Sequence, residues 1–144
     1  MPADTFSIRQ GFRLRTLVVD DSPAMRLAIC RLLEMTPEVE IVGAAGAGAA
    51  ALDLVERLRP DLVLMDIFMP GMNGLDATVH LRKHFPEVRV IIVTVYDSPE
   101  GHMAAKACGA HGFVPKARLH LDLCSEIKRC YAKDPSHAES EEAE

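Results

Sequence analysis

Five short apolar runs, each followed by a segment with helical spacing, constrain the fold of this chain more than any other feature. The apolar runs lie at about 17–19, 39–42, 62–65, 90–93 and 112–115. One helical pattern begins after Ser22 and Pro23, and the others cover about 48–59, 75–84, 99–108 and 119–133. Five strand–helix units in succession predict an α/β protein built on a parallel sheet.

The composition of each run predicts its place in that sheet. Runs 17–19, 62–65 and 90–93 are continuously apolar, which is typical of strands covered on both faces. Run 39–42 alternates, and run 112–115 contains Pro115, which lacks the N–H that a central strand donates. We therefore expect these two at the edges. The resulting order is 2-1-3-4-5 with right-handed crossovers, a flavodoxin-like (βα)5 three-layer sandwich.

The length of 144 residues fits one folded unit, which we expect over residues 14–133. Residues 1–13 are expected to form a flexible leader, and the acidic stretch 134–144 a disordered tail or linker. The chain contains no apolar run of 18 residues and no signal-peptide core, which predicts a cytoplasmic protein without a membrane span. The net charge of −5 argues against binding of nucleic acid by this chain alone. None of the four cysteines forms a C-x-x-C pair, so we expect free and mostly buried thiols.

Polar residues follow the predicted strands at the points where those strands end. Asp20 and Asp21 follow the first run, and Asp66 follows the third. Thr94 ends the fourth run, and Lys116 follows the fifth. Ligands of such sheets bind beyond the carboxyl ends of the strands, so these side chains are expected to converge. Carboxylates at ~4 Å repel by roughly 1 to 4 kcal/mol, which Mg²⁺ and the Lys116 ammonium would relieve.

The motifs around these residues resemble the receiver domain of two-component response regulators. They read VVDDSPAMR, DLVLMDIFMPGMNGLD, VIIVTV and GAHGFVPKA, and the resemblance covers about residues 14–133. The segment GFVPKA is most similar to receivers of regulators that carry a helix-turn-helix output domain.

The resemblance implies a role for each residue at the strand ends. Asp66 would accept a phosphoryl group from a sensor histidine kinase or a phosphotransfer protein. Asp21, Asp66 and the backbone carbonyl of Phe68 would ligate Mg²⁺ directly, with Asp20 acting through water. Lys116 would pair with the phosphoryl oxygens.

The resemblance also implies a switch, formed by Thr94 and the aromatic residue Phe113. A phosphoryl group adds a charge near −2, and Thr94 moving towards it would draw Phe113 inward. The surface formed by 99–108, 112–115 and 119–133 would change and control a partner or a DNA-binding output domain.

Three apolar residues depart from the common receiver pattern near the acceptor. Val95 stands where many receivers carry a small residue, and we expect it to slow both phosphorylation and hydrolysis. Phe68 and Tyr96 lie two residues after Asp66 and Thr94, where they are expected to exclude water and prolong the life of a phosphoaspartate.

Other functions remain to be weighed against a signalling protein that is not an enzyme. A haloacid-dehalogenase-type phosphatase needs D-x-D, but position 68 is Phe68. A flavin carrier needs a phosphate-binding loop after the first strand. This chain has Asp20 and Asp21 there, whose carboxylates would repel the flavin phosphate. A degenerate receiver that acts as a phosphorylation-independent interaction module stays open because of Val95.

Two further sequence features favour structural explanations. His80 and His84 are four residues apart and could share a metal, although a solvated helix end is favoured. The stretch Gly43–Gly48 does not fit a phosphate-binding motif, and we expect an exposed loop.

The sequence leaves open whether the chain is a single-domain regulator or part of a longer transcription factor. A homodimer through the first helix or through the 99–108, 112–115 and 119–133 surface is equally open. The cognate kinase, the stimulus and the controlled process have no signal in the sequence.

Overall fold

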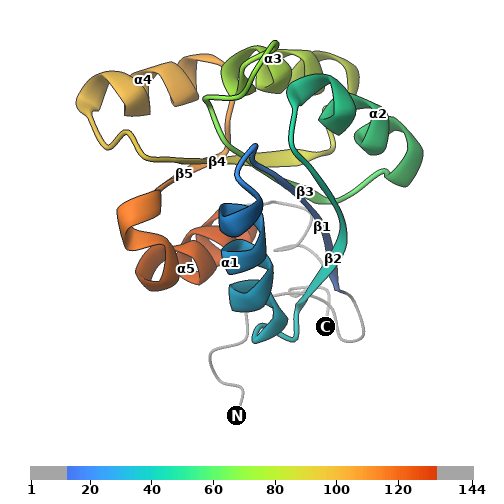
Figure 1. Cartoon of the computed structure of the whole chain (residues 1–144), viewed down its shortest axis with the longest axis vertical. Coiled ribbons are helices and arrows are strands. Elements are labelled where there is room, and N and C mark those ends of the chain that lie inside the picture. Colours follow the sequence, from blue (N-terminus) through green and yellow to red (C-terminus); the bar gives the residue numbers. More distant parts are fainter. Residues whose placement is uncertain (1–12, 133–144) are drawn as a thin grey trace.

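Five parallel strands form one sheet with the order β2-β1-β3-β4-β5 in the computed structural model, which describes residues 13–132. Helices α1 and α5 cover one face of the sheet, and α2, α3 and α4 cover the other (Figure 1). This arrangement confirms the flavodoxin-like sandwich and its strand order. The strands are β1 (Leu14–Val19), β2 (Val39–Ala45), β3 (Leu62–Met65), β4 (Arg89–Thr94) and β5 (Gly112–Pro115).

Side-chain caps begin three of the helices, and each of these helices follows a loop at the carboxyl edge of the sheet. The side-chain oxygens of Ser22, Asn73 and Ser98 accept backbone N–H groups of the first turns of α1, α3 and α4. Such caps satisfy donors that the helix itself leaves unpaired. The helices are α1 (Pro23–Glu34), α2 (Gly48–Leu58), α3 (Gly74–His84), α4 (Pro99–Ala107) and α5 (Leu119–Ala132), with a 3₁₀ turn at Lys116–Arg118 before α5.

The central strands are buried on both faces, as their continuous apolar runs predicted. In β3, Val63 and Met65 pack in the core beneath α2, α3 and α4, whereas Leu64 packs in the core beneath α1 and α5. Successive side chains of a strand point to opposite faces, so one apolar run serves both cores.

The edge strand β2 is longer than expected, and the expectation of a loop at Gly43–Gly48 was wrong for its first half. Gly43–Ala45 continue the strand and pair with β1 after a shift in register between Thr16 and Leu17. A Cβ on Gly43 would lie 3.2 Å from both Leu17 and Leu58. The small residues therefore permit a close approach, and pairing with β1 holds a segment whose own composition disfavours a strand.

Several smaller expectations from the sequence can be compared with the structure. β1 begins at Leu14 rather than Leu17, and the Arg13 guanidinium donates to the carbonyls of Pro37 and Val39. The expectations for residues 1–12 and 133–144 lie outside the described residues. Cys130 alone among the four cysteines is buried, so the expectation of mostly buried thiols was wrong. Within residues 13–132, no helix is long and apolar enough to cross a membrane.

His111 joins the edge strand β5 to β4 through two hydrogen bonds. Its Nδ1 accepts the N–H of Val90 at 3.1 Å, and its own N–H donates to the Val90 carbonyl at 2.7 Å. Burial, together with the charges of Arg82 and Arg89, lowers the pKa of His111 to about 4. The imidazole is therefore neutral at pH 7, with its proton on Nε2 because Nδ1 accepts.

Acidification is expected to weaken the fold through His111. An unfolded histidine titrates near 6.5, so between pH 6.5 and about 4 the unfolded chain binds the extra proton. The free energy of unfolding should fall by about 2 to 3 kcal/mol through this window because of His111. Urea unfolding of wild type and His111→Gln at pH 7 and pH 4.5 measures it. The variant should show a correspondingly smaller loss on acidification; equal losses in the two proteins would refute this role.

Candidate functional site

Three carboxylates meet where the neighbouring strands β1 and β3 end. Val19 and Met65 are register partners, so Asp20 and Asp66, which follow them, lie side by side. Asp20, Asp21 and Asp66 each offer a carboxylate oxygen within 4.8 Å of the others. The sequence placed these three residues at one edge of the sheet, and the structure brings them together there.

Asp20 is fixed through its backbone and its side chain. Its N–H donates to the Ala45 carbonyl at 3.0 Å, and its Oδ1 accepts the Ser22 N–H at 2.9 Å. The Arg26 guanidinium donates to the Asp20 carbonyl at 2.7 Å. Sequence reasoning missed Arg26; its signal was a cation one helical turn beyond the acidic pair.

Asp66 is positioned by the tight loop between β3 and α3. Its N–H donates to the Val19 carbonyl at 2.9 Å, and the Gly74 N–H donates to the Ile67 carbonyl at 2.7 Å. A Cβ on Gly74 would collide with the Asp66 carbonyl oxygen, so a residue without a side chain is required there. The glycine of the M-P-G-M-N-G segment at position 74 thus sets the path of the loop that follows Asp66.

Lys116 supplies a positive charge to the two buried carboxylates. Its Nζ lies 2.7 Å from Asp20 Oδ2 and 3.4 Å from Asp66 Oδ2. Asp20 and Asp66 are only 1% and 4% exposed, so water screens this cluster weakly. Burial and the charge of Asp20 raise the pKa of Asp66 above its ordinary value, and Lys116 opposes them.

The acidic cluster has the donor set of a hard divalent cation. Its atoms are carboxylate oxygens, which Mg²⁺ prefers, and Mg²⁺ commonly takes only one or two carboxylates with water completing its shell. Asp20 Oδ2 is buried and receives no hydrogen bond from the described residues, although Lys116 pairs with it as an ion. Asp21 is exposed, so its carboxylate is open to a cation from solvent. The residues present therefore fit the ion.

Thr94 and two aromatic residues form the neighbouring part of the carboxyl edge. Thr94 is fully buried at the end of β4, and its Oγ1 accepts the Tyr96 N–H at 3.4 Å. The rings of Phe68 and Tyr96 lie 4.9 Å apart, which joins the loop after β3 to the loop after β4. Both rings and the Val95 side chain are more than half exposed.

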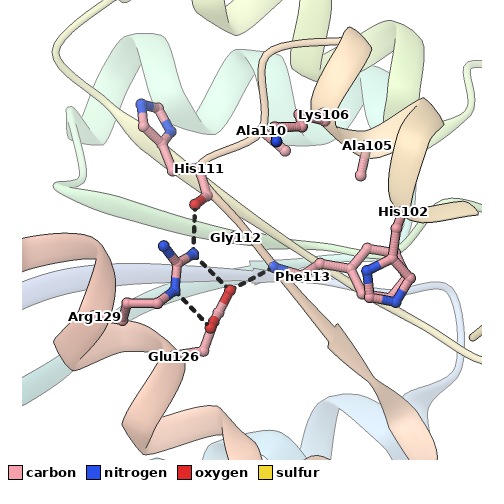
Figure 2. A pocket seen from close by; sticks show the side chains of 9 residues that line it. All are labelled: His102, Ala105, Lys106, Ala110, His111, Gly112, Phe113, Glu126 and Arg129. Atoms are coloured by element: carbon pink, nitrogen blue, oxygen red, sulfur yellow. Dashed lines mark hydrogen bonds and ion pairs between the residues drawn. The ribbon is translucent and has the colours of Figure 1, made fainter. Parts of the chain in front are cut away.

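Phe113 lies on the same face of the sheet as Thr94. Phe113 pairs with Ile92, and Thr94 is two residues further along β4, so the side chains of all three point to one side. The Phe113 ring stacks on His102 of α4 with centroids 3.8 Å apart (Figure 2). Its backbone N–H donates to Glu126 Oε2 at 2.9 Å.

A pocket of about 540 Å³ opens between α4, β5 and α5, beside Phe113 (Figure 2). None of the three carboxylates lines it. Its small residues are Ala105, Ala110 and Gly112. Its larger lining residues are His102, Lys106, His111, Phe113, Glu126 and Arg129.

The histidine pair on α3 does not complete a metal site. The rings of His80 and His84 lie 4.3 Å apart on an exposed face. Among residues 13–132, the acidic trio is the group of three or more ligand-type residues close enough to share an ion. Structural zinc takes four ligands and catalytic zinc three, so two histidines fall short.

Comparison with known proteins identifies the family. The family model described as "Response regulator receiver domain" matches residues 16–128, and the chain belongs to this family. NarP, a nitrate/nitrite response regulator of Escherichia coli (strain K12), is 41% identical over 102 residues, covering 71% of this chain and 47% of NarP. GacA of Pseudomonas aeruginosa is 34% identical over 119 residues, covering 83% of this chain and 56% of GacA.

Solved structures agree with this assignment. The signal receiver domain of NarL from Mycobacterium tuberculosis has a TM-score of 0.79 at 32% identity and covers 85% of this chain and 99% of that one. A DNA-binding response regulator of the LuxR family from Staphylococcus aureus has a TM-score of 0.74 at 30% identity, covering 81% and 98%. The resemblance to receivers of helix-turn-helix-output regulators is confirmed. The chain spans about half the length of the curated relatives it matches.

Proposed function

We propose that this chain is a phosphorylation-dependent switch of a two-component system, with Asp66 as the acceptor. A carboxylate oxygen of Asp66 attacks the phosphorus of a phosphohistidine on a sensor kinase or phosphotransfer protein. The O–P bond forms, the N–P bond breaks, and the imidazole leaves with the electron pair. The observation that carries this proposal is the buried Asp66 carboxylate with the Lys116 ammonium 3.4 Å from it.

The other residues at the edge would stabilise the transferring group. Mg²⁺, bound by Asp21, Asp66 and the Phe68 carbonyl with Asp20 acting through water, would supply positive charge to the phosphoryl oxygens. Lys116 is held beside Asp66 and would pair with those oxygens as their charge develops. Its contact with Asp20 keeps the ammonium at the edge before the phosphoryl group arrives.

The added charge would be read out through Thr94 and Phe113. Thr94 would donate a hydrogen bond from its hydroxyl to the phosphoryl group. Phe113 would then turn inward, towards the space that Thr94 leaves. Phe113 belongs to the surface formed by α4, β5 and α5, so this surface would change with phosphorylation. It would then control a partner, a second copy of the chain, or a DNA-binding output domain in a longer protein.

We place this switch in the cytoplasm, acting on proteins rather than as an enzyme with a substrate of its own. Contact with nucleic acid would come from an output domain, because the chain has a net charge of −5. The alternative is a degenerate receiver that binds its partner without phosphorylation. Val95, exposed next to Thr94, is the observation that favours it.

Intact mass after incubation with acetyl phosphate distinguishes the two. Wild type is expected to gain one phosphoryl group with Mg²⁺ and little without it, because the carboxylate cluster needs a counter-charge. Asp66→Asn should gain none. Asp53→Asn, an exposed aspartate of α2, is the matched control and should gain one.

A gain that survives in Asp66→Asn would contradict the assignment of the acceptor. No gain in wild type with either acetyl phosphate or a phosphorylated kinase would favour the degenerate receiver.

The exposed apolar side chains are expected to slow the reactions of Asp66. We expect Val95→Ala to raise the rates of both phosphorylation and hydrolysis by about tenfold, or roughly 1.4 kcal/mol of barrier. Removing the Phe68 and Tyr96 rings should shorten the life of the phosphoaspartate, because water gains access. Intact mass followed over time after removal of the donor measures hydrolysis.

Val79→Ala on α3 is the control for Val95→Ala, since it makes the same change at an exposed valine. Unchanged rates in Val95→Ala would show that Val95 does not slow the reactions of Asp66. A phosphoaspartate that lasts only seconds in wild type would show that Phe68 and Tyr96 do not protect it from water.

A further inference from the structure

We propose that His102 is a positioning residue that holds the Phe113 ring against α4 and thereby sets the balance between the two states of the switch. This inference rests on the proposed function, in which Phe113 turns inward on phosphorylation. It assigns the resting position of the ring to one contact, made by a helix that carries none of the three carboxylates of the site.

The two rings are in close contact, with their planes tilted relative to one another. Their centroids lie 3.8 Å apart with an interplanar angle of 32° (Figure 2). For Phe113 to turn inward, this stack must be lost. Aromatic pairs change an equilibrium by about a factor of 2 to 10 beyond the effect of buried area. His102 therefore opposes the inward state by a factor in this range.

His102 is itself fixed at the start of α4. Its Nε2 donates to Asp97 Oδ1 at 3.0 Å, and its backbone N–H donates to the Ser98 carbonyl at 3.0 Å. Asp97 and Ser98 follow Thr94 in the segment between β4 and α4. A shift of Thr94 towards a phosphoryl group would pull on this segment. The movement of Thr94 would therefore be transmitted to His102, which contacts the Phe113 ring.

The backbone of Phe113 is held from the opposite side by α5. The Phe113 N–H donates to Glu126, which Arg129 holds by contacts of 2.8 and 3.0 Å. Arg129 also donates to the His111 carbonyl at 2.9 Å. These bonds fix the strand, so rotation of the Phe113 side chain is the movement left free. The Phe113 side chain is half-buried: it packs against the core beneath α2, α3 and α4, and it also borders the pocket.

Fluorine NMR of protein labelled with fluorophenylalanine tests the proposal before any phosphorylation. The chain has five phenylalanines, and Phe113→Leu identifies the resonance of position 113. The solvent isotope shift between H₂O and D₂O reports how exposed the fluorine is. In His102→Ala the shift at position 113 should decrease, because the released ring turns inward.

The opposite sign overturns the proposal. If His102 merely covers a ring that stays in place, its removal uncovers Phe113 and the isotope shift increases. An unchanged shift overturns the proposal equally. His102→Phe keeps a ring at the contact and should restore the wild-type shift, whereas Met103→Ala, the exposed neighbour on α4, should not alter it.

The rate of phosphorylation is the second readout. His102→Ala should accept a phosphoryl group from acetyl phosphate about 2- to 10-fold faster than wild type. His102→Phe should accept it at the wild-type rate. An unaltered or lower rate in a folded His102→Ala protein overturns the coupling. If no protein gains a phosphoryl group from either acetyl phosphate or a phosphorylated kinase, the proposed function fails, and the isotope shift still decides whether His102 positions Phe113.

Discussion

The crowding of three carboxylates at the ends of β1 and β3 is the constraint on which the rest of this structure depends. Asp20 and Asp66 are buried, so water does little to weaken their repulsion. Lys116 lies within 2.7 and 3.4 Å of them, but it is carried by the turn after the edge strand β5. The ammonium reaches the cluster only if β1, β3, β4 and β5, which are neighbours in that order, are in register.

The same constraint links Asp66 to the outer surface of the domain. Lys116 follows β5, so the strand that delivers the counter-charge also carries Phe113. Phe113 is held by His102 on α4 and by Glu126 on α5. A change in charge at Asp66 therefore acts on a strand that already contacts both helices of the proposed output surface. This gives a physical reason why a small chemical change could be read at a distance.

The sequence predicted the fold well where local patterns reflect burial. Continuous apolar runs identified the central strands, Pro115 identified an edge, and strand ends identified the acidic residues. It failed for Gly43–Ala45, because pairing with β1 rather than intrinsic propensity makes that segment a strand. It also missed Arg26, although its partner, the Asp20 carbonyl, is only six residues away in the chain. The contact between His102 and Phe113 has no periodic pattern in the sequence, because it forms only where α4 packs beside β5.

A double-mutant cycle between Asp66 and Lys116 tests the central electrostatic claim most directly. The free energy of unfolding is measured without Mg²⁺ for wild type, Asp66→Asn, Lys116→Met and the double variant. Lys116→Met should cost about 1 to 2 kcal/mol more in wild type than in the Asp66→Asn background, because in wild type it leaves a second buried carboxylate uncompensated. Equal costs in the two backgrounds would show that Lys116 does not balance the charge of Asp66, and the account would be wrong.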